Sequence, residues 1–304
     1  MSRVWTDAAS LETPVLTRAD GGDLKRLLTG PPGITRSWRR GVARLRSGRL
    51  PSMLATFSDG RRFQIDAGDL MYEQVYRLGE YEPEVTQAIR SLLRPGDFAV
   101  DLGANHGWYV VVMAYAVGGD GQIWAVEPGA AMVASLRANL ELNPGLPVIV
   151  HNLAVGDADG KVLLHHFSSL PHGHASTRTL GHEDFTEEAV ECSTLDSLLV
   201  DAVRLPNLIK LDVEGSELAA LRGAATVLAA RQSMWVIEVN SETSAAFGYT
   251  PTEPLDPFFN GYDVYRLVSG GLLPETDRLA APHGTMWLCV PPAMSRRTDG
   301  LIVA

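Results

Sequence analysis

The stretch that decides the fold runs Phe98-Ala99-Val100-Asp101-Leu102-Gly103-Ala104-Asn105-His106-Gly107. A short apolar run ends in an acid, a glycine-rich turn follows, and a helical pattern then extends from about residue 107 to residue 117. The glycines allow a tight backbone turn and a close approach to a ligand. An apolar strand, a glycine turn and a helix in this order predict the ligand-binding turn of an open α/β sheet.

Short apolar runs alternate with helical patterns along the rest of the chain. We expect helices over residues 130–142 and after residue 212, and strands over residues 123–126, 148–150, 208–211, 234–239, 262–268 and 285–290. This alternation predicts an α/β fold with a mainly parallel sheet that is covered on both faces. Only a loop with Gly270-Gly271 separates the last two runs, so we expect them to form an antiparallel hairpin at one edge.

The other parts of the chain are arranged around this core. We expect a basic N-terminal extension over residues 1–50, a hairpin and a helix packed on the core over residues 51–95, the core over residues 96–292 and a C-terminal tail over residues 293–304. Asp59-Gly60 indicates the hairpin turn, and Pro83 suits a first helical turn. Residues 161–199 interrupt the alternation, so we interpret them as an insertion of two extended pieces above the carboxyl ends of the strands.

The charge of the chain restricts its partners. The formal net charge is −10, which argues against general nucleic-acid binding because that requires a basic footprint. Residues 1–62 nevertheless hold twelve Lys or Arg against five Asp or Glu, an excess of seven positive charges. The basic cluster in this part is either a solvated helix face or a landing site for an anionic substrate, a carrier protein or a lipid head group; it comprises Arg36, Arg39, Arg40, Arg44, Arg46 and Arg49.

The sequence predicts a cytoplasmic protein without a membrane span. The longest apolar run, residues 108–117, is about ten residues long, whereas a bilayer span needs roughly twenty. Residues 1–9 have no apolar core behind a basic start, so we expect no secretory signal. Two distant cysteines, Cys192 and Cys289, indicate reduced, packed thiols and not a zinc site.

The glycine turn favours S-adenosylmethionine over a dinucleotide. The spacing is not Gly-x-Gly-x-x-Gly, and Asp101 at the end of the strand would repel a pyrophosphate. The ammonium group at the amino-acid end of S-adenosylmethionine suits an acidic rim better. We therefore predict that the cofactor is bound by Asp101, Gly103, Ala104, Asn105 and Gly107.

Two later strand ends are expected to complete the nucleoside site. Glu127, followed by Pro128, ends the second strand about 24 residues beyond Gly103, where an acid can accept hydrogen bonds from ribose hydroxyls. Glu127 can also cap the following helix, and the two roles are compatible. Asn152 and Ala154, just past the third strand, would meet the adenine edge or form a plain turn.

The fourth strand ends in Ile209-Lys210-Leu211-Asp212-Val213-Glu214-Gly215-Ser216-Glu217. Three acids and a lysine in so short a stretch are unusual for packing. We predict that Asp212 points into the crevice as a site residue. Glu214 and Glu217 can instead be acids of a first helical turn, where they favour the helix dipole.

These motifs together resemble the FkbM family of S-adenosylmethionine-dependent methyltransferases. The resemblance covers roughly residues 60 to 292 and includes three further segments: Gly79-Glu80-Tyr81-Glu82, Thr194-Leu195-Asp196 and Trp235-Val236-Ile237-Glu238. It implies a class I methyltransferase fold and methyl transfer, commonly to an oxygen of a sugar, polyketide or related metabolite. It also implies that Tyr81 and Glu82 line the mouth of the cofactor or acceptor site.

Several groups are candidates for the base that activates the acceptor hydroxyl. Histidine titrates near neutral pH, and the candidate histidines are His106 in the turn and His165, His166, His172 and His174 in the insertion. Of these, His174 is the preferred catalytic residue. Asp212 and Glu238 are alternatives, and with Asn240 they could hold Mg²⁺, although a bound metal is the less favoured interpretation.

The sequence thus predicts an O-methyltransferase that acts on a hydroxyl of a small molecule, which is anionic or carrier-bound if the basic arm binds it. Two alternatives are a binding module that holds the cofactor without catalysis and, less favoured, a nicotinamide-dependent oxidoreductase, which should carry the Gly-x-Gly-x-x-Gly turn. A homodimer is compatible with this organisation, but no residue pattern requires one.

Overall fold

The centre of the molecule is an eight-stranded sheet in the order β14-β13-β15-β12-β11-β4-β5-β6. The computed structural model describes residues 15–18, 52–66, 69–167, 175–179, 181, 184–276 and 285–303. Five neighbouring strands are parallel: β4 (Phe98–Leu102), β5 (Gln122–Val126), β6 (Val148–His151), β11 (Leu208–Leu211) and β12 (Met234–Val239). Three antiparallel strands extend the sheet at one edge: β13 (Asp263–Val268), β14 (Gly271–Pro274) and β15 (Thr285–Val290). The mainly parallel α/β sheet with an antiparallel edge is therefore confirmed.

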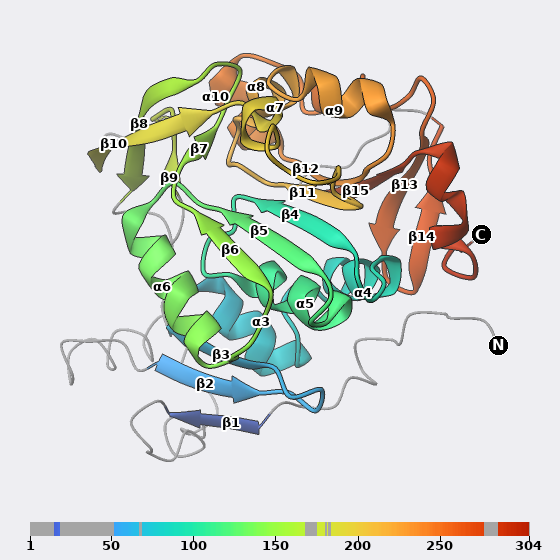
Figure 1. The fold of residues 1–304 in the computed structure, drawn as a ribbon. Helices are drawn as coiled ribbons and strands as arrows, with labels where there is room; N and C mark the ends of the chain where they lie inside the picture. Colours follow the sequence, from blue (N-terminus) through green and yellow to red (C-terminus); the bar gives the residue numbers. More distant parts are fainter. Residues whose placement is uncertain are drawn as a thin grey trace, which may run out of the picture.

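Helices cover both faces of this sheet (Figure 1). One face packs against α3 (Leu70–Leu78), α4 (Pro83–Leu92), α5 (Trp108–Val117) and α6 (Ala130–Glu141). The other face packs against α7 (Leu195–Leu198), α8 (Glu217–Arg222) and α9 (Ala225–Ala230). Every residue of β4 is buried, as a strand covered on both faces requires.

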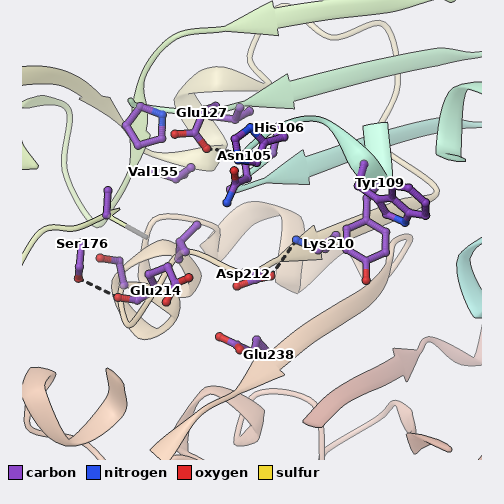
Figure 2. A pocket seen from close by; sticks show the side chains of 18 of the residues that line it. Asn105, His106, Tyr109, Glu127, Val155, Ser176, Lys210, Asp212, Glu214 and Glu238 are labelled. Carbon is purple, nitrogen blue, oxygen red and sulfur yellow. Dashed lines mark hydrogen bonds and ion pairs between the residues drawn. The ribbon is translucent and has the colours of Figure 1, made fainter. Parts of the chain in front are cut away.

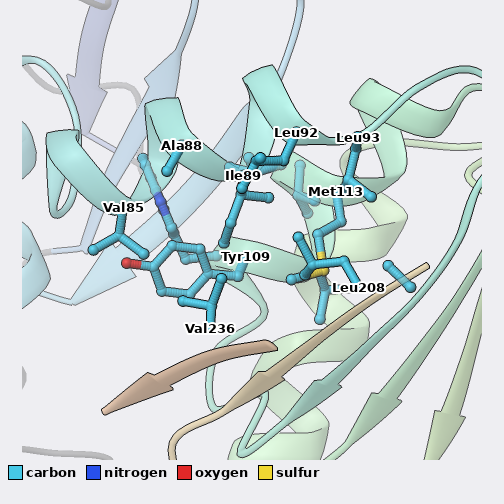
Figure 3. Close-up of a cluster of buried hydrophobic side chains, with 14 of the residues drawn as sticks. Val85, Ala88, Ile89, Leu92, Leu93, Tyr109, Met113, Leu208 and Val236 are labelled. Carbon is cyan, nitrogen blue, oxygen red and sulfur yellow. The ribbon is translucent and has the colours of Figure 1, made fainter. Parts of the chain in front are cut away.

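Eight of the ten residues of α5 are buried, which fits its almost wholly apolar sequence. Met113 of α5 is fully buried between α4 and the sheet, beside Ile89 of α4 and Leu208 of β11 (Figure 3). Apolar residues all around a helix are typical of burial on every face. Because α5 begins directly after the glycine turn, this packing fixes the turn at the end of β4.

A small sheet precedes the core, as the Asp59-Gly60 signal predicts. β2 (Ser52–Thr56) and β3 (Arg62–Asp66) form an antiparallel hairpin, and β1 (Val15–Arg18) pairs with β2. Asn139 of α6 accepts a hydrogen bond from Gln64 N through its Oδ1 (2.8 Å) and donates one to His106 O through its Nδ2 (3.0 Å). One side chain therefore links the hairpin, α6 and the glycine turn.

The insertion and the short strand β7 before it form a separate four-stranded sheet in the order β7-β10-β8-β9. The two extended pieces expected in it are β8 (Gly160–Phe167) and β10 (Phe185–Ser193), which pair antiparallel along their length; the short strands are β7 (Ala154–Val155) and β9 (Ala175–Ser176). Figure 1 shows this sheet beyond the carboxyl ends of β4, β5 and β6.

Two expectations about the last third of the chain are wrong. The Gly270 turn leads from β13 into β14, so the last two predicted runs pair antiparallel without being joined by that turn. The helix expected after Asp212 is divided into α8 and α9. A Cβ on Gly223, between the two, would lie 2.1 Å from Gly156 O, and this close approach leaves no room for a side chain there.

The C-terminal segment is packed on the core. The 3-10 helix η4 (Pro292–Thr298) carries Arg297, whose Nη1 lies 2.6 Å from Asp97 Oδ2 and donates to Leu92 O (2.9 Å).

Two further short helices follow β12, namely α10 (Ser241–Phe247) and η2 (Glu253–Leu255). Among the described residues, no helix combines the length and apolar character needed to cross a bilayer, and both Cys192 and Cys289 are buried free thiols.

Candidate functional site

A cavity of about 300 Å³ opens at the carboxyl ends of the parallel strands. Its wall includes residues from the ends of β4, β5, β11 and β12 and from the insertion (Figure 2). Nine of the residues predicted to bind the cofactor line it: Tyr81, Glu82, Gly103, Ala104, Asn105, Glu127, Pro128, Ala154 and Asp212. Three others, Asp101, Gly107 and Asn152, do not line it.

Backbone geometry explains the glycines of the turn. Gly103 has φ +81°, and a Cβ there would lie 1.8 Å from Asp212 O, so the turn after β4 lies directly against the loop after β11. Gly107 has φ +86°, and a Cβ would lie 2.2 Å from Leu136 Cδ1. L side chains avoid such positive φ values. Gly107 therefore serves the packing of the turn and not the wall of the cavity.

Glu127 joins the two loops that form the floor of the cavity. Its Oε2 accepts a hydrogen bond from Asn105 N (2.8 Å), and its Oε1 accepts one from Gly129 N (2.9 Å). Burial raises the pKa of the Glu127 carboxyl to about 7, although the two amide hydrogen bonds oppose the shift. Each carboxylate oxygen can accept a further hydrogen bond, so Glu127 offers two acceptor positions to a ligand.

Asn152 supports this part of the site from behind. Its Nδ2 donates to Glu127 O (3.0 Å) and to Pro128 O (2.8 Å). The side chain therefore holds the loop after β5 instead of meeting a ligand. The neighbouring Leu153, Ala154 and Val155 add an apolar wall to the cavity.

Asp101 is buried against Lys210, which we did not predict as a site residue. Asp101 and Lys210 are register partners on the adjacent strands β4 and β11, and Lys210 Nζ lies 3.4 Å from Asp101 Oδ1. Burial raises the pKa of Asp101 to about 6, in spite of the opposing effect of Lys210. Since Asp101 is fully buried and absent from the cavity wall, direct contact between its carboxylate and a ligand ammonium is not supported.

Lys210 is a site residue that sequence reasoning missed. It lines the cavity, lies 3.1 Å from Asp212 Oδ2, and places Nζ 4.9 Å from the centre of the Tyr109 ring. Burial alone would lower the pKa of Lys210, but Asp101 and Asp212 outweigh burial and raise it. The available signal was a lysine inside an apolar strand, because a buried lysine needs partners.

Tyr81, Glu82 and Tyr109 form one side of the cavity. Glu82 has φ +39°, its amide donates to Gln74 Oε1 (3.0 Å), and its carboxylate accepts a short hydrogen bond from Tyr109 OH. Burial raises the pKa of Glu82, and the Tyr109 hydroxyl opposes this shift. Neither Tyr109 nor Gln74 was predicted, because their approach to Glu82 depends on the packing of α3 and α5.

Asp212 and Glu238 extend from neighbouring strand ends into the same part of the cavity (Figure 2). One carboxylate oxygen from each of Asp212, Glu217 and Glu238 lies within 4.8 Å of the other two. Burial, and then the charges of Asp212 and Glu214, raise the pKa of Glu238 well above its ordinary value. Asn240, which we expected beside them, is turned away: its Oδ1 caps α10 by accepting from Glu242 N (3.0 Å).

The five candidate histidines divide into three groups. His172 and His174 lie outside the described residues, as does the basic cluster of residues 36–49. His165 and His166 do not line the cavity, because they face Glu187 (3.3 Å) and Glu188 (2.8 Å) across β8 and β10.

His106 does line the cavity, but both of its ring nitrogens have partners. Nε2 lies 2.8 Å from Asp69 Oδ2, and Nδ1 lies 2.9 Å from Ser135 Oγ. The imidazole therefore links the turn to the residues before α3 and to α6, which does not suit a base that must face an acceptor.

The sequence of this chain matches the model of one protein family. A family model described as "Methyltransferase FkbM domain" matches residues 101–263. A curated relative, "Methyltransferase 1" from Beauveria bassiana (strain ARSEF 2860), is 28% identical over 148 residues, which cover 41% of this chain and 57% of the relative.

Solved structures show weaker likeness. Methyltransferase FkbM from Methylobacillus flagellatus KT is 18% identical with a TM-score of 0.39, over 74% of this chain and 55% of that one. A SAM-dependent O-methyltransferase from Thermotoga maritima is 12% identical with a TM-score of 0.39, over 93% and 96% of the two chains. The chain thus spans little more than half the length of both the curated relative and the Methylobacillus protein.

Proposed function

Because the chain belongs to the FkbM methyltransferase family, we propose that it binds S-adenosylmethionine in the cavity and transfers the methyl group to a hydroxyl oxygen of a small molecule. The observation that carries the proposal is Glu127, whose carboxylate is held at the cavity floor by the amides of Asn105 and Gly129. An acid fixed at the end of the second strand is suited to accept hydrogen bonds from both ribose hydroxyls.

The chemistry of the wall fits this cofactor better than a dinucleotide. Leu153, Ala154 and Val155 give the nucleoside half an apolar wall for a base. Among the described residues that line the cavity, Lys210 is the only lysine or arginine, and it is already engaged by two carboxylates. A pyrophosphate would face an excess of negative charge, whereas a sulfonium and an ammonium are attracted by it.

The reacting end lies beside Asp212 in this proposal. When bound, the cofactor supplies a methyl group that its positive sulfur has already activated for in-line displacement. The side chain of Asp212 is 24% exposed and is oriented by Lys210 at 3.1 Å. It can therefore accept the proton of an acceptor hydroxyl while the oxygen takes the methyl group and the electron pair of the broken bond remains on sulfur. Alignment of this kind supplies roughly 7–11 kcal/mol in favourable cases.

The insertion limits the access of water to this end. Ser176 and Thr177 line the cavity, and the Ser176 hydroxyl donates to Glu214 O (2.8 Å) while Thr177 Oγ1 lies 3.0 Å from Ser216 Oγ. These contacts hold the insertion over the loop after β11. Exclusion of water strengthens the electrostatic interactions within the cavity.

Calorimetric titration tests the cofactor assignment. We expect S-adenosylmethionine and S-adenosylhomocysteine to bind and NAD not to bind. Glu127→Gln should weaken the binding by about 10- to 100-fold, because hydrogen bonds to a charged acceptor contribute about 1.5–3 kcal/mol each. Glu141→Gln, on the exposed part of α6, is the matched control. Equal affinity in the two variants would remove Glu127 from the site.

Transfer of a labelled methyl group to a panel of hydroxyl-bearing metabolites tests the reaction. Asp212→Asn should lower kcat by about 10²- to 10⁴-fold, the usual contribution of a general base. Cofactor binding without transfer to any hydroxyl would favour the binding module, and a product methylated on nitrogen or carbon would contradict the proposed acceptor atom.

A further inference from the structure

The unusual feature left beside the cavity is a group of three carboxylates on three different elements. Asp212 follows β11, Glu238 lies near the end of β12, and Glu217 begins α8. One oxygen from each lies within 4.8 Å of the others. Like charges this close repel one another strongly when they are shielded from water. Oxygens at this limit can lie on opposite sides of one cation with ligands at about 2.4 Å, and a smaller cation such as magnesium, with ligands at about 2.1 Å, draws them together by about half an ångström.

The protein fixes Glu217 without neutralising the cluster. Glu217 is buried, its Oε1 accepts from Val213 N (3.0 Å) and Gly215 N (3.2 Å), and its Oε2 lies 2.8 Å from Tyr249 OH. These donors are neutral. They place the carboxylate firmly and leave its charge in the cluster, as the outer partners of metal ligands do.

Glu238 gives the second, independent observation. Its Oε2 is enclosed by protein and receives no hydrogen bond from any described residue, although buried side-chain oxygens nearly always have a partner. The same side chain lines the cavity and points toward Asp212 (Figure 2). A ligand that satisfies this oxygen must therefore enter from the cavity, between Glu238 and Asp212.

The local charge balance indicates what kind of ligand this is. In the described part of the chain, the ammonium group of Lys210 contacts Asp101 and Asp212, and no lysine or arginine forms an ion pair with Glu217 or Glu238. Four carboxylates against one lysine leave an excess of three negative charges when all are ionised. The donor atoms are oxygens only, with no histidine or cysteine in the cluster, and this is the preference of a hard divalent cation such as Mg²⁺ or Mn²⁺.

We propose that Asp212, Glu217 and Glu238 form a binding site for one hard divalent cation beside the cofactor cavity. Three protein ligands leave coordination positions for water on the cavity side, where Mg²⁺ usually keeps several waters. The role of the cation in the reaction rests on the proposed function. One of these positions is available to the acceptor oxygen, so that the cation orients the hydroxyl and lowers its pKa.

The test is a Mn²⁺ titration of the full chain, freed of metal with EDTA and followed by electron paramagnetic resonance in the absence of cofactor. The wild type should bind one Mn²⁺, which excess Mg²⁺ displaces. Glu238→Gln and Asp212→Asn should each weaken binding by more than about tenfold, since even outer-shell changes typically cost 10- to 100-fold. No bound Mn²⁺ in the wild type would overturn the proposal.

Glu214→Gln is the matched control, because Glu214 also lines the cavity but lies outside the cluster. It should retain Mn²⁺ binding; an equal loss in this variant would show general attraction to acidic charge and would contradict coordination.

Mn²⁺ should raise the Tm of the wild type and leave that of Glu238→Gln unchanged, which guards against misfolding of the variant. Cofactor titration in EDTA separates the two proposals, since S-adenosylmethionine binding without metal upholds the cofactor assignment whatever the Mn²⁺ result.

Discussion

At the scale of single residues, Glu127 links cofactor binding to pH. Burial raises its pKa from 4.5 to about 7, and only the ionised carboxylate can accept both ribose hydrogen bonds. A ligand that requires the ionised form lowers the pKa and releases a proton, so affinity rises with pH through the pKa of the free protein. For S-adenosylhomocysteine we expect about tenfold tighter binding at pH 8 than at pH 6, measured by calorimetry.

The control for this pH effect is Glu127→Gln, which removes the titrating group and should flatten the profile. An affinity that stays constant over this range in the wild type would contradict the role of the carboxylate. The same shift has the opposite sign for folding. Because the unfolded carboxyl releases its proton near pH 4.5 and the folded one near pH 7, this group reduces the free energy of unfolding as pH rises between these values.

The site residues that could be predicted from the sequence are those at the ends of the predicted strands. Glu127 and Asp212 could be selected because each follows an apolar run, and the carboxyl ends of parallel strands meet at one edge of the sheet. Lys210 was missed because its role depends on its register with Asp101 across two strands that are far apart in the sequence. For the same reason the sequence did not show that Asp101, which we expected to contact the cofactor, is a buried partner of Lys210.

At the scale of elements, Asn139 joins three segments that no local pattern connects. Its amide bonds Gln64 N of the hairpin and His106 O of the glycine turn, and its side chain is buried on α6. Asn139→Ala leaves both backbone groups without this partner. We expect the free energy of unfolding in urea to fall by about 2 kcal/mol, since each orphaned group costs about 1–3 kcal/mol.

The same variant should also weaken S-adenosylhomocysteine binding, because His106 O belongs to the turn that lines the cavity. Glu141→Ala, on an exposed site of the same helix, should change neither quantity. If Asn139→Ala were as stable as Glu141→Ala, the proposed link between the hairpin and the turn would be wrong.

The predicted ends of helices and strands were wrong at two places in the last third of the chain. The helix after Asp212 looked continuous from Leu218 to Leu228, yet Gly223 lies against Gly156 O and the helix is divided there. The antiparallel edge was expected correctly, but the strand β14 was not, because its short run could be read as part of a loop. Local pattern predicts that a strand or helix forms but leaves its ends open, and the close approach to Gly156 O explains only why residue 223 carries no side chain.

At the scale of the whole molecule, the chain folds so that acids from separate segments converge on one cavity. The mainly parallel sheet with its antiparallel edge and the position of the insertion above the strand ends could be predicted from alternation and from the glycine turn. The attachment of the C-terminal segment could not, because it depends on Arg297 reaching Asp97 at the start of β4. An ion pair between residues so far apart in the sequence cannot be recognised from the residues around either partner.

The central claim is that the cavity holds an adenosyl amino acid whose ribose is bound by Glu127. A crystal structure grown with both S-adenosylhomocysteine and NAD present tests it most directly. We predict S-adenosylhomocysteine in the cavity, with its ribose oxygens about 2.7–3.2 Å from the Glu127 carboxylate. NAD in that position, or a ribose that does not reach Glu127, would contradict the account.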